Sequence, residues 1–314
     1  MSDQARRVLQ WVQKYQGLAG LALLLLVALV WERQFFMPEN LRNVFNQCAI
    51  PGTLAIGMTF VILTGGIDLS VGSHLALLNC IVAAWGKAGA SLPVTALYVL
   101  LLGTGIGALL GATISLSRLQ PFVVTLAAMV SLRGVAFVYT GNANISGIGE
   151  SLRPLKESWF GLPVPVWILF ALLAVTVAIL KGTVFGRRIY AIGGGEAASH
   201  YAGVPVDRTR IAAYAVNGLC VGIAALLLTA RTNNGQPGAA QSYELDAIAA
   251  VVVGGSSLLG GYGNSLGSVV GALFILSTDT LLNLKGIDDK VGLGLKGVIL
   301  LIAVYVQNLG RRDR

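Results

Sequence analysis

Ten mostly apolar stretches, several of them long enough to cross a bilayer, recur along this 314-residue chain and constrain its fold more than any other feature. A helix needs about 20 such residues to cross the hydrocarbon core, and fewer where glycine breaks it or the chain re-enters. Charged residues make up 11% of the chain, against about 25% in soluble domains. The sequence therefore predicts an all-α integral membrane protein with about ten transmembrane helices.

The predicted spans differ in length and regularity. The eighth is short and ends in glycine-rich sequence, so it is either a full helix or a re-entrant one. The first follows several basic residues but lacks a small-residue cleavage site after it, which favours an uncleaved anchor. We expect the ten spans at residues 17–31, 49–63, 71–85, 92–116, 121–139, 164–180, 211–230, 247–259, 266–282 and 291–306.

Glycine is unusually frequent. The chain has 40 glycines, nearly twice what average usage of about 7% would give. Helices in a bilayer associate without a hydrophobic drive, so small residues that let backbones approach closely are favoured where they meet. The glycine content agrees with many closely packed membrane helices.

The charges between the spans predict an orientation. With the N-terminus inside, the predicted cytoplasmic segments hold 12 Lys and Arg residues and the outer segments hold 8. An excess of positive charge marks the cytoplasmic side. We therefore expect both termini in the cytoplasm, with a cytoplasmic segment at 1–16, a transmembrane domain at 17–306 and a cytoplasmic tail at 307–314.

Several enzyme and metal signatures are missing from the sequence. The two histidines and three cysteines lie far apart, without metal-ligand spacing. Neither a GxxxxGK[ST] phosphate loop nor an HExxH motif occurs. We expect no catalytic residue, no metal and no cofactor on this chain. The chain has a net charge of +8. Its basic residues flank the apolar segments, which favours a role in membrane orientation over binding of nucleic acid.

The predicted cytoplasmic loop at 181–210 carries five Lys and Arg residues. Glycines there lead into a short run of small residues that ends at Gly203, with Pro205 just beyond, and both are helix stop signals. A short helix of this kind suits docking in a groove of a partner protein. Alternatively, the loop is a solvated basic segment that only sets topology. The candidate docking residues are Gly193, Gly194, Gly195, Glu196, Ala197, Ala198, Ser199 and Gly203.

Four stretches carry a resemblance to a known family. They read ILTGGIDLSVGS at 62–73, LQPFVVTL at 119–126, TVFGRRIYAIGG at 183–194 and YELDAIAAVVVGGSSL at 243–258. Arg133-Gly134 follows the second, and KGVILL at 296–301 comes near the end. In this order, and covering roughly residues 45–305, they resemble the permease subunits of bacterial ABC sugar importers of the ribose, xylose and galactose group.

The resemblance implies an assembly. Two copies of the permease, two pseudo-symmetric halves in each, would form a dimeric pathway across the bacterial inner membrane. A separate cytoplasmic ABC ATPase would bind ATP, which fits the missing phosphate loop, and a soluble sugar-binding protein would deliver the cargo from outside. Ribose is the first choice of sugar, and another pentose, a galactose-like sugar or a related furanosyl compound are alternatives.

The resemblance also bears on the loop at 181–210. Importers of this kind carry a Glu-Ala-Ala-three-residues-Gly signature where the ATPase docks. Counting back from Gly203, the Glu-Ala-Ala positions of the signature are occupied by Ala197, Ala198 and Ser199, and Glu196 stands one position early. The small residues and the glycine are kept, which is consistent with docking, whereas the glutamate departs from the pattern.

Polar residues inside the predicted spans are candidates for lining a pathway. Charged ones usually face a bundle interior or a water-filled cavity, but near an interface they can also reach out of the membrane or pair with each other or with a carbonyl. Uncharged ones can bind sugar hydroxyls or make interhelical hydrogen bonds. The candidates are Ser73, His74, Asn79, Arg133, Asn217, Asp279 and Lys296.

The first family stretch predicts a helix break. Asp68 follows two glycines and precedes the third span, so we expect it to cap the start of that helix, and contact with a partner or substrate is the alternative. The break motif comprises Gly65, Gly66, Asp68, Ser70 and Gly72.

Rival functions make different demands on the sequence. An ion-coupled secondary transporter or channel would need intramembrane acids, and the spans offer Asp279 and little else. An intramembrane enzyme or scaffold would need converging nucleophiles, metals or paired acids. A branched-chain amino-acid permease of the same superfamily is closer, and the ligand of its binding protein would distinguish it.

Overall fold

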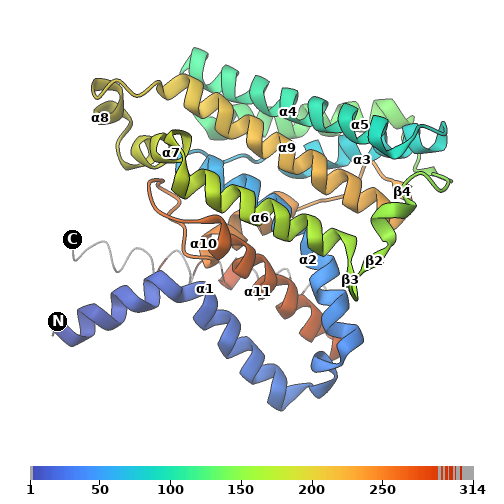
Figure 1. The fold of residues 1–314 in the computed structure, drawn as a ribbon, viewed down its shortest axis with the longest axis horizontal. Helices are drawn as coiled ribbons and strands as arrows, with labels where there is room; N and C mark the ends of the chain where they lie inside the picture. The colour runs from blue at the N-terminus through green and yellow to red at the C-terminus, as the bar shows by residue number, and fades with distance from the viewer. Residues whose placement is uncertain are drawn as a thin grey trace.

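The protein is described by a computed structural model, which covers the backbone of residues 3–288 and of 291, 292, 294, 295, 297–299, 301 and 305, with side chains from Gly17 onward. Helices dominate (Figure 1). The α-helices are α1 Asp3–Trp31, α2 Pro38–Leu63, α3 Val71–Lys87, α4 Leu92–Ser117, α5 Pro121–Thr140, α6 Val164–Gly182, α7 Val184–Gly194, α8 Glu196–Tyr201, α9 Val206–Thr232, α10 Tyr243–Val253 and α11 Ser265–Leu284. Two 3₁₀ turns (Arg33–Phe36, Arg153–Lys156) and four short strands, β1 Ile145–Ser146, β2 Ser158–Trp159, β3 Leu162–Pro163 and β4 Asn234–Gly235, complete the described part.

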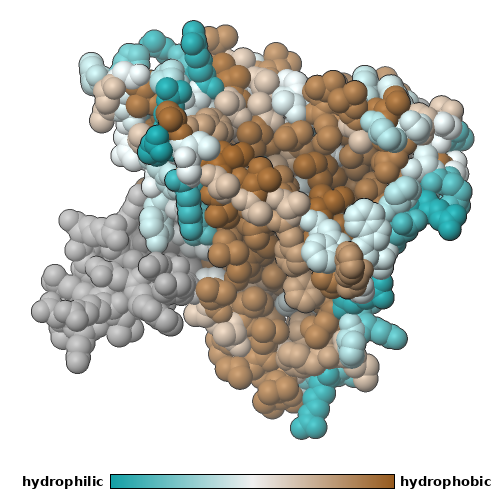
Figure 2. Space-filling view, in the orientation of Figure 1, coloured by the Kyte–Doolittle hydropathy of each residue, from teal (hydrophilic) through white to brown (hydrophobic). Residues whose placement is uncertain are grey.

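Six of the described helices, α2, α4, α5, α6, α9 and α11, are long and apolar enough to cross a membrane, and the part Gly17–Trp31 of α1 is a shorter apolar helix. The helices run between two ends of the molecule (Figure 1). We call these the α8 end, which holds α7 and α8, and the strand end, where β1 pairs with β4 and β2 with β3. In Figure 2, hydrophilic side chains gather towards these ends and apolar ones cover the surface between them. The described part therefore has the surface of a membrane-embedded helix bundle.

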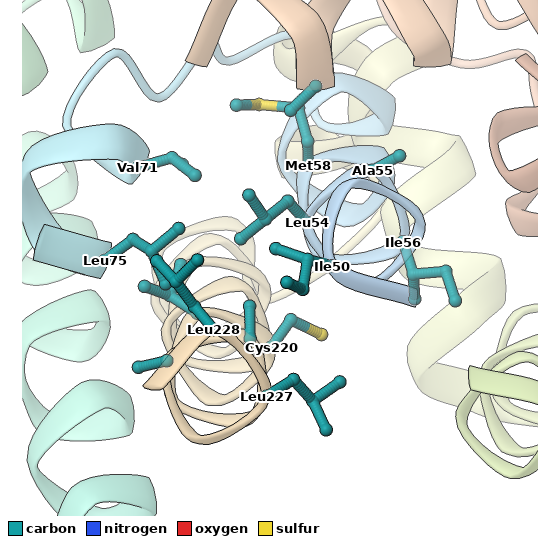
Figure 3. Packing of buried hydrophobic residues seen from close by; sticks show 14 of the residues in the cluster. Ile50, Leu54, Ala55, Ile56, Met58, Val71, Leu75, Cys220, Leu227 and Leu228 are labelled. Carbon is teal, nitrogen blue, oxygen red and sulfur yellow. The ribbon is translucent and has the colours of Figure 1, made fainter. Parts of the chain in front are cut away.

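Helix α2 forms the centre of the bundle. From Cys48 to Leu63 almost all of its residues are buried, and it packs against α6, α9, α10 and α11. Figure 3 shows its Ile50 and Leu54 pointing towards Leu75 of α3 and Leu228 of α9. A helix that is apolar all round and enclosed by others is the core of such a bundle.

Glycines set the contact between α4 and α9. Gly103, Gly107 and Gly111 lie four residues apart on α4 and therefore share one face. A Cβ added at Gly103 would come within 2.6 Å of the carbonyl oxygen of Gly218 on α9. The backbones of the two helices touch, as the glycine content predicts.

Two helices begin inside the bundle. An α-helix rises about 1.5 Å per residue, so the 17 residues of α3 span about 25 Å and the 11 residues of α10 about 16 Å, whereas the 26-residue α2 spans about 39 Å. Non-helical segments, 64–70 and 236–242, lead into their N-termini. These N-termini meet, because a Cβ at Gly72 in the first turn of α3 would collide with Glu244 in the first turn of α10.

Several predicted span boundaries differ from the structure. The predicted second span, 49–63, is the second half of α2, which begins at Pro38, and the predicted seventh span begins five residues late. The eighth, predicted at 247–259, corresponds to α10, which is about half a bilayer long and ends at Val253, because glycines turn the chain there. Lys296, the tail 307–314 and most of the predicted span 291–306 lie outside the described residues.

Candidate functional site

The chain breaks between α2 and α3 at the predicted motif. Gly65 has φ +80°, which favours glycine, and a Cβ at Gly66 would lie 2.7 Å from the Tyr214 hydroxyl oxygen. The buried carboxylate of Asp68 accepts hydrogen bonds from the backbone N–H (2.9 Å) and the hydroxyl (2.6 Å) of Ser70. Asp68 therefore closes the turn just before α3, and Ser70 stands at the N-cap position of that helix without a side-chain capping bond to the helix backbone.

Asn217 joins this break to α9. Its side-chain amide donates to the second carboxylate oxygen of Asp68 at 2.8 Å, and both residues are 1% exposed. The side chain lies over Gly57 of α2, where a Cβ would be 2.5 Å from its Oδ1. A buried carboxylate is costly unless it is hydrogen-bonded, and three bonds from two segments stabilise this one.

Asn79 joins α3 to the non-helical segment that leads into α10. Its amide donates to the Thr229 hydroxyl (2.8 Å) and to the Asn234 carbonyl (3.1 Å), while its Oδ1 accepts from the Gln236 N–H (2.8 Å). Fully used polar atoms of this kind hold two elements in one register. Asn79 is thus an interhelical bridge in this structure.

Arg133 holds the same segment from the other side. Its Nη1 donates to the carbonyls of Pro237 (2.9 Å) and Ala239 (2.6 Å). The position is the thirteenth of the 20 residues of α5, well inside the helix. Pairing with a carbonyl was one of the alternatives for this residue, and in the structure Arg133 donates two hydrogen bonds to non-helical backbone.

The other described candidates lie in two separate places. Ser73 and His74 are buried in the first turn of α3, and Nε2 of His74 has no hydrogen-bond partner among the described residues. Asp279 is half-buried near the end of α11, close to the backbone of Gly292. The structure thus gathers Asp68, Asn217, Asn79 and Arg133 around the two breaks and does not bring Asp279 to them.

The segment 181–210 folds into helices. Thr183 caps α7, accepting from the Gly186 N–H at 3.1 Å. A Cβ at Gly193 would collide with the Leu63 carbonyl and the Gly261 N–H, so the last turn of α7 sits directly on the end of α2 and on the turn after α10. The Tyr190 hydroxyl donates to the Gly263 carbonyl at 2.8 Å, and burial raises its pKa. Of the three glycines before the run of small residues, two belong to α7 and only Gly195 separates it from α8.

Helix α8 projects from this base. Its Ala197 and Ala198 are exposed and its Ser199 is buried. Glu196 forms an ion pair of 2.6 Å with Arg210 on α9, whose side chain is only 12% exposed. After α8, Gly203 has φ +79° and turns the chain into α9. A pair of short helices thus presents small side chains outward, and the second is tied by an ion pair to the long helix α9.

A hollow of about 820 Å³ opens at the α8 end. It lies between α8, the turn joining α4 to α5, the start of α9 and the break after α2. Its lining includes Gly65, Arg118, Glu196, Tyr201 and Arg210. The hollow reaches from the projecting α8 to the first break.

Sequence reasoning missed two of these residues. Glu244 stands inside the bundle at the start of α10, and Arg210 is the partner of Glu196. Glu244 was visible as a charged residue directly before an apolar run, but the span predicted at 247–259 placed it outside the membrane. Arg210 had no local signal, because its partner lies 14 residues earlier in the chain.

Comparison with known proteins identifies relatives of the whole chain. The model of a family described as "branched-chain amino acid transport system / permease component" matches residues 40–304. The ribose import permease protein RbsC of Haemophilus influenzae is 40% identical over 92% of this chain and 91% of its own length. RbsC of Escherichia coli is 38% identical over 95% and 94% of the two chains.

A relative with a different sugar in its name is somewhat less similar. The xylose transport system permease protein XylH of Escherichia coli is 33% identical over 94% of this chain and 91% of its own length. No solved structure matches the chain.

Proposed function

Because the chain belongs to the family of branched-chain amino acid transport system permease components, we propose that it is the membrane-spanning permease subunit of an ABC importer that carries ribose inward. The single observation that carries this proposal is the identity of 38–40% with ribose import permeases over almost the whole chain. Xylose is the next candidate, given 33% identity with a xylose permease. An amino acid is a weaker candidate, since these relatives are named as sugar permeases.

The proposed architecture is a homodimer of ten-span subunits with both termini in the cytoplasm of a bacterium, which places the α8 end inside. Inverted pseudo-symmetric halves are supported by two matching units. In one, α2 leads through segment 64–70 into α3, and in the other α9 leads through segment 233–242 into α10, with opposite direction. Discontinuous helices that meet at mid-membrane are typical of inverted-repeat transporters.

The proposed coupling site for a separate ATPase subunit is α8 with the turn to Gly203. Exposed small side chains suit insertion into a partner's groove, and the Glu196–Arg210 pair would pass a push on α8 to α9. Asn217 on α9 then bonds to Asp68 at the first break. A binding protein would deliver the sugar at the strand end. The remaining polar candidates inside the bundle would line the path from the strand end to the α8 end.

The test is ribose uptake by the chain purified with its co-purifying partners, reconstituted with ATP on the α8 side and the ribose-loaded binding protein on the other. We expect uptake that stops without ATP. Uptake that survives ATP depletion and collapses with a protonophore would instead establish ion coupling, since a ligand or ion must supply the conformational bias.

A matched pair of variants tests the coupling site. Gly203 and Gly89 both have left-handed φ, +79° and +81°, and open space around them. Gly203→Asp should abolish uptake with normal membrane insertion, whereas Gly89→Asp, in the turn between α3 and α4, carries the same backbone strain away from α8. Normal uptake by Gly203→Asp would overturn the docking role.

A further inference from the structure

The segment Gln236–Ser242 is non-helical backbone at membrane depth. It runs along α3: a Cβ at Gly235 would lie 3.1 Å from Cα of Cys80, and one at Gly72 would collide with the Ala240 carbonyl. Gly238 and Gln241 are nevertheless exposed, as is Leu245, which is 52% exposed. Non-helical backbone in a bilayer is tolerated only where protein buries it or where it lines a water-filled cavity. This exposed face therefore cannot be a lipid-facing one.

The backbone here is also strained. Ala240 and Ser242 have φ +55° and +66°, a region that non-glycine residues seldom adopt. Arg133 fixes the carbonyls of Pro237 and Ala239, which holds this conformation in place. Strain of this kind persists only where surrounding contacts over-determine it.

Glu244 adds an unmatched acceptor directly beneath this face, against Gly72 of α3. Its Oε2 is buried and accepts no hydrogen bond from the residues that the structure describes. It lies where the N-terminal, positive ends of α3 and α10 meet. Oε2 therefore keeps its capacity to accept hydrogen bonds.

We propose that the face Gly238–Asp246, beside Arg133, lines the water-filled passage, and that Glu244 accepts hydrogen bonds from the hydroxyls of the monosaccharide as it crosses. A carboxylate accepts from several donors, so it suits a neutral polyhydroxylated ligand. Arg133 is a positioning residue for this face. The inference rests on the proposed sugar import.

The first test is thiol labelling in the reconstituted full transporter. Cys48, Cys80 and Cys220 are all buried, so an introduced cysteine reports with little background. Leu245→Cys should react with a charged, membrane-impermeant methanethiosulfonate, and ribose-loaded binding protein with ATP should slow the reaction at least threefold. The control is Leu23→Cys: Leu23 is 64% exposed on α1, which packs on α11, and should face lipid and not react.

Equal reactivity of the two cysteines, or none at Leu245→Cys, would overturn the water-lined face. Reaction at Leu245→Cys that sugar transport does not slow would overturn the passage of sugar along it.

The second test separates transport from ATP hydrolysis. Glu244→Gln keeps the size of the side chain and removes its charge and one acceptor. We expect ribose uptake to fall at least tenfold while binding-protein-stimulated ATPase activity stays within twofold, and Glu244→Asp to recover part of the uptake. Unchanged uptake, or a parallel loss of uptake and ATPase activity, would overturn the role of Glu244. Wild-type ribose uptake in the same vesicles tests the proposed function separately.

Discussion

Replacing Gly103 by alanine should push α4 and α9 apart. The new Cβ would lie 2.6 Å from the Gly218 carbonyl oxygen and 3.1 Å from Cδ1 of Leu78. The obstructing atom is backbone, so no side chain can turn away. The matched control is Gly105→Ala on the same helix, where nothing lies within 4 Å of the added Cβ.

The magnitude follows from the separation needed. An ordinary contact requires the helices to move apart by about 0.8 Å, and a gap of about 0.5–1 Å forfeits a quarter to a half of each van der Waals contact. Overpacking costs about 1–3 kcal/mol. Membrane helices lack a hydrophobic drive to compensate. We therefore expect Gly103→Ala to lose about 2 kcal/mol, while Gly105→Ala gains up to about 1 kcal/mol of helix propensity.

The assay is thermal unfolding in one detergent, followed by tryptophan fluorescence. Trp85 of α3 stacks on Tyr98 of α4 with ring centroids 4.3 Å apart and reports on α4 directly. At about 2 °C per kcal/mol, the melting temperatures of the two variants should differ by about 4–6 °C. Melting temperatures within about 1 °C of each other would refute the close-packing argument.

Three further predictions concern other contacts. Gly193→Ala, whose Cβ would meet backbone of Leu63 and Gly261, should speed amide exchange in α7, whereas Gly194→Ala, with open space around it, should not; equal exchange would contradict the seating of α7. Asn79→Ala leaves Gln236 and its other partners without their bonds and should cost about 2–4 kcal/mol in chemical unfolding; a loss below about 0.5 kcal/mol would show that water replaces the bridge. Glu32 pairs with Lys285 at 2.9 Å, chiefly through a hydrogen bond that lowers its pKa. A lowered carboxyl pKa stabilises the fold above the ordinary pKa and stops doing so as the pH falls through the lowered value. The melting temperature lost in Lys285→Met at pH 7 should therefore shrink towards pH 3, and a constant difference would argue against the pair.

The structure of segment 181–210 was predictable in part because its signals are local. Glycine and proline end helices through their own backbone geometry, so the stop at Gly203 and Pro205 could be read directly. The close contact of Gly193 with the backbone of Leu63 and Gly261 could not be predicted, because these residues are distant in the chain.

Local sequence left the region around Glu244 open. The apolar run at 247–259 is shorter than a full span, so hydropathy allowed either a full helix or a re-entrant one. Only the packed structure shows that α10 begins inside the bundle against Gly72 and that Arg133 fixes the backbone before it. Where a charged residue stands relative to the bilayer is a tertiary property when the helix carrying it is only half a membrane thick.

The sequence by itself determined the membrane class, the helical content, the position of the first break and the family, because hydropathy, glycine placement and long motifs are properties of consecutive residues. The tertiary structure decided which polar groups meet. Asp68 and Asn217, 149 residues apart, and Arg133 and Ala239, 106 apart, are joined by hydrogen bonds whose geometry depends on how the helices pack. Inside a bilayer, water cannot satisfy a buried polar group, so the packing of the helices decides which polar groups form hydrogen bonds. It also decides which acceptors, such as Oε2 of Glu244, have no hydrogen-bond donor among the described residues.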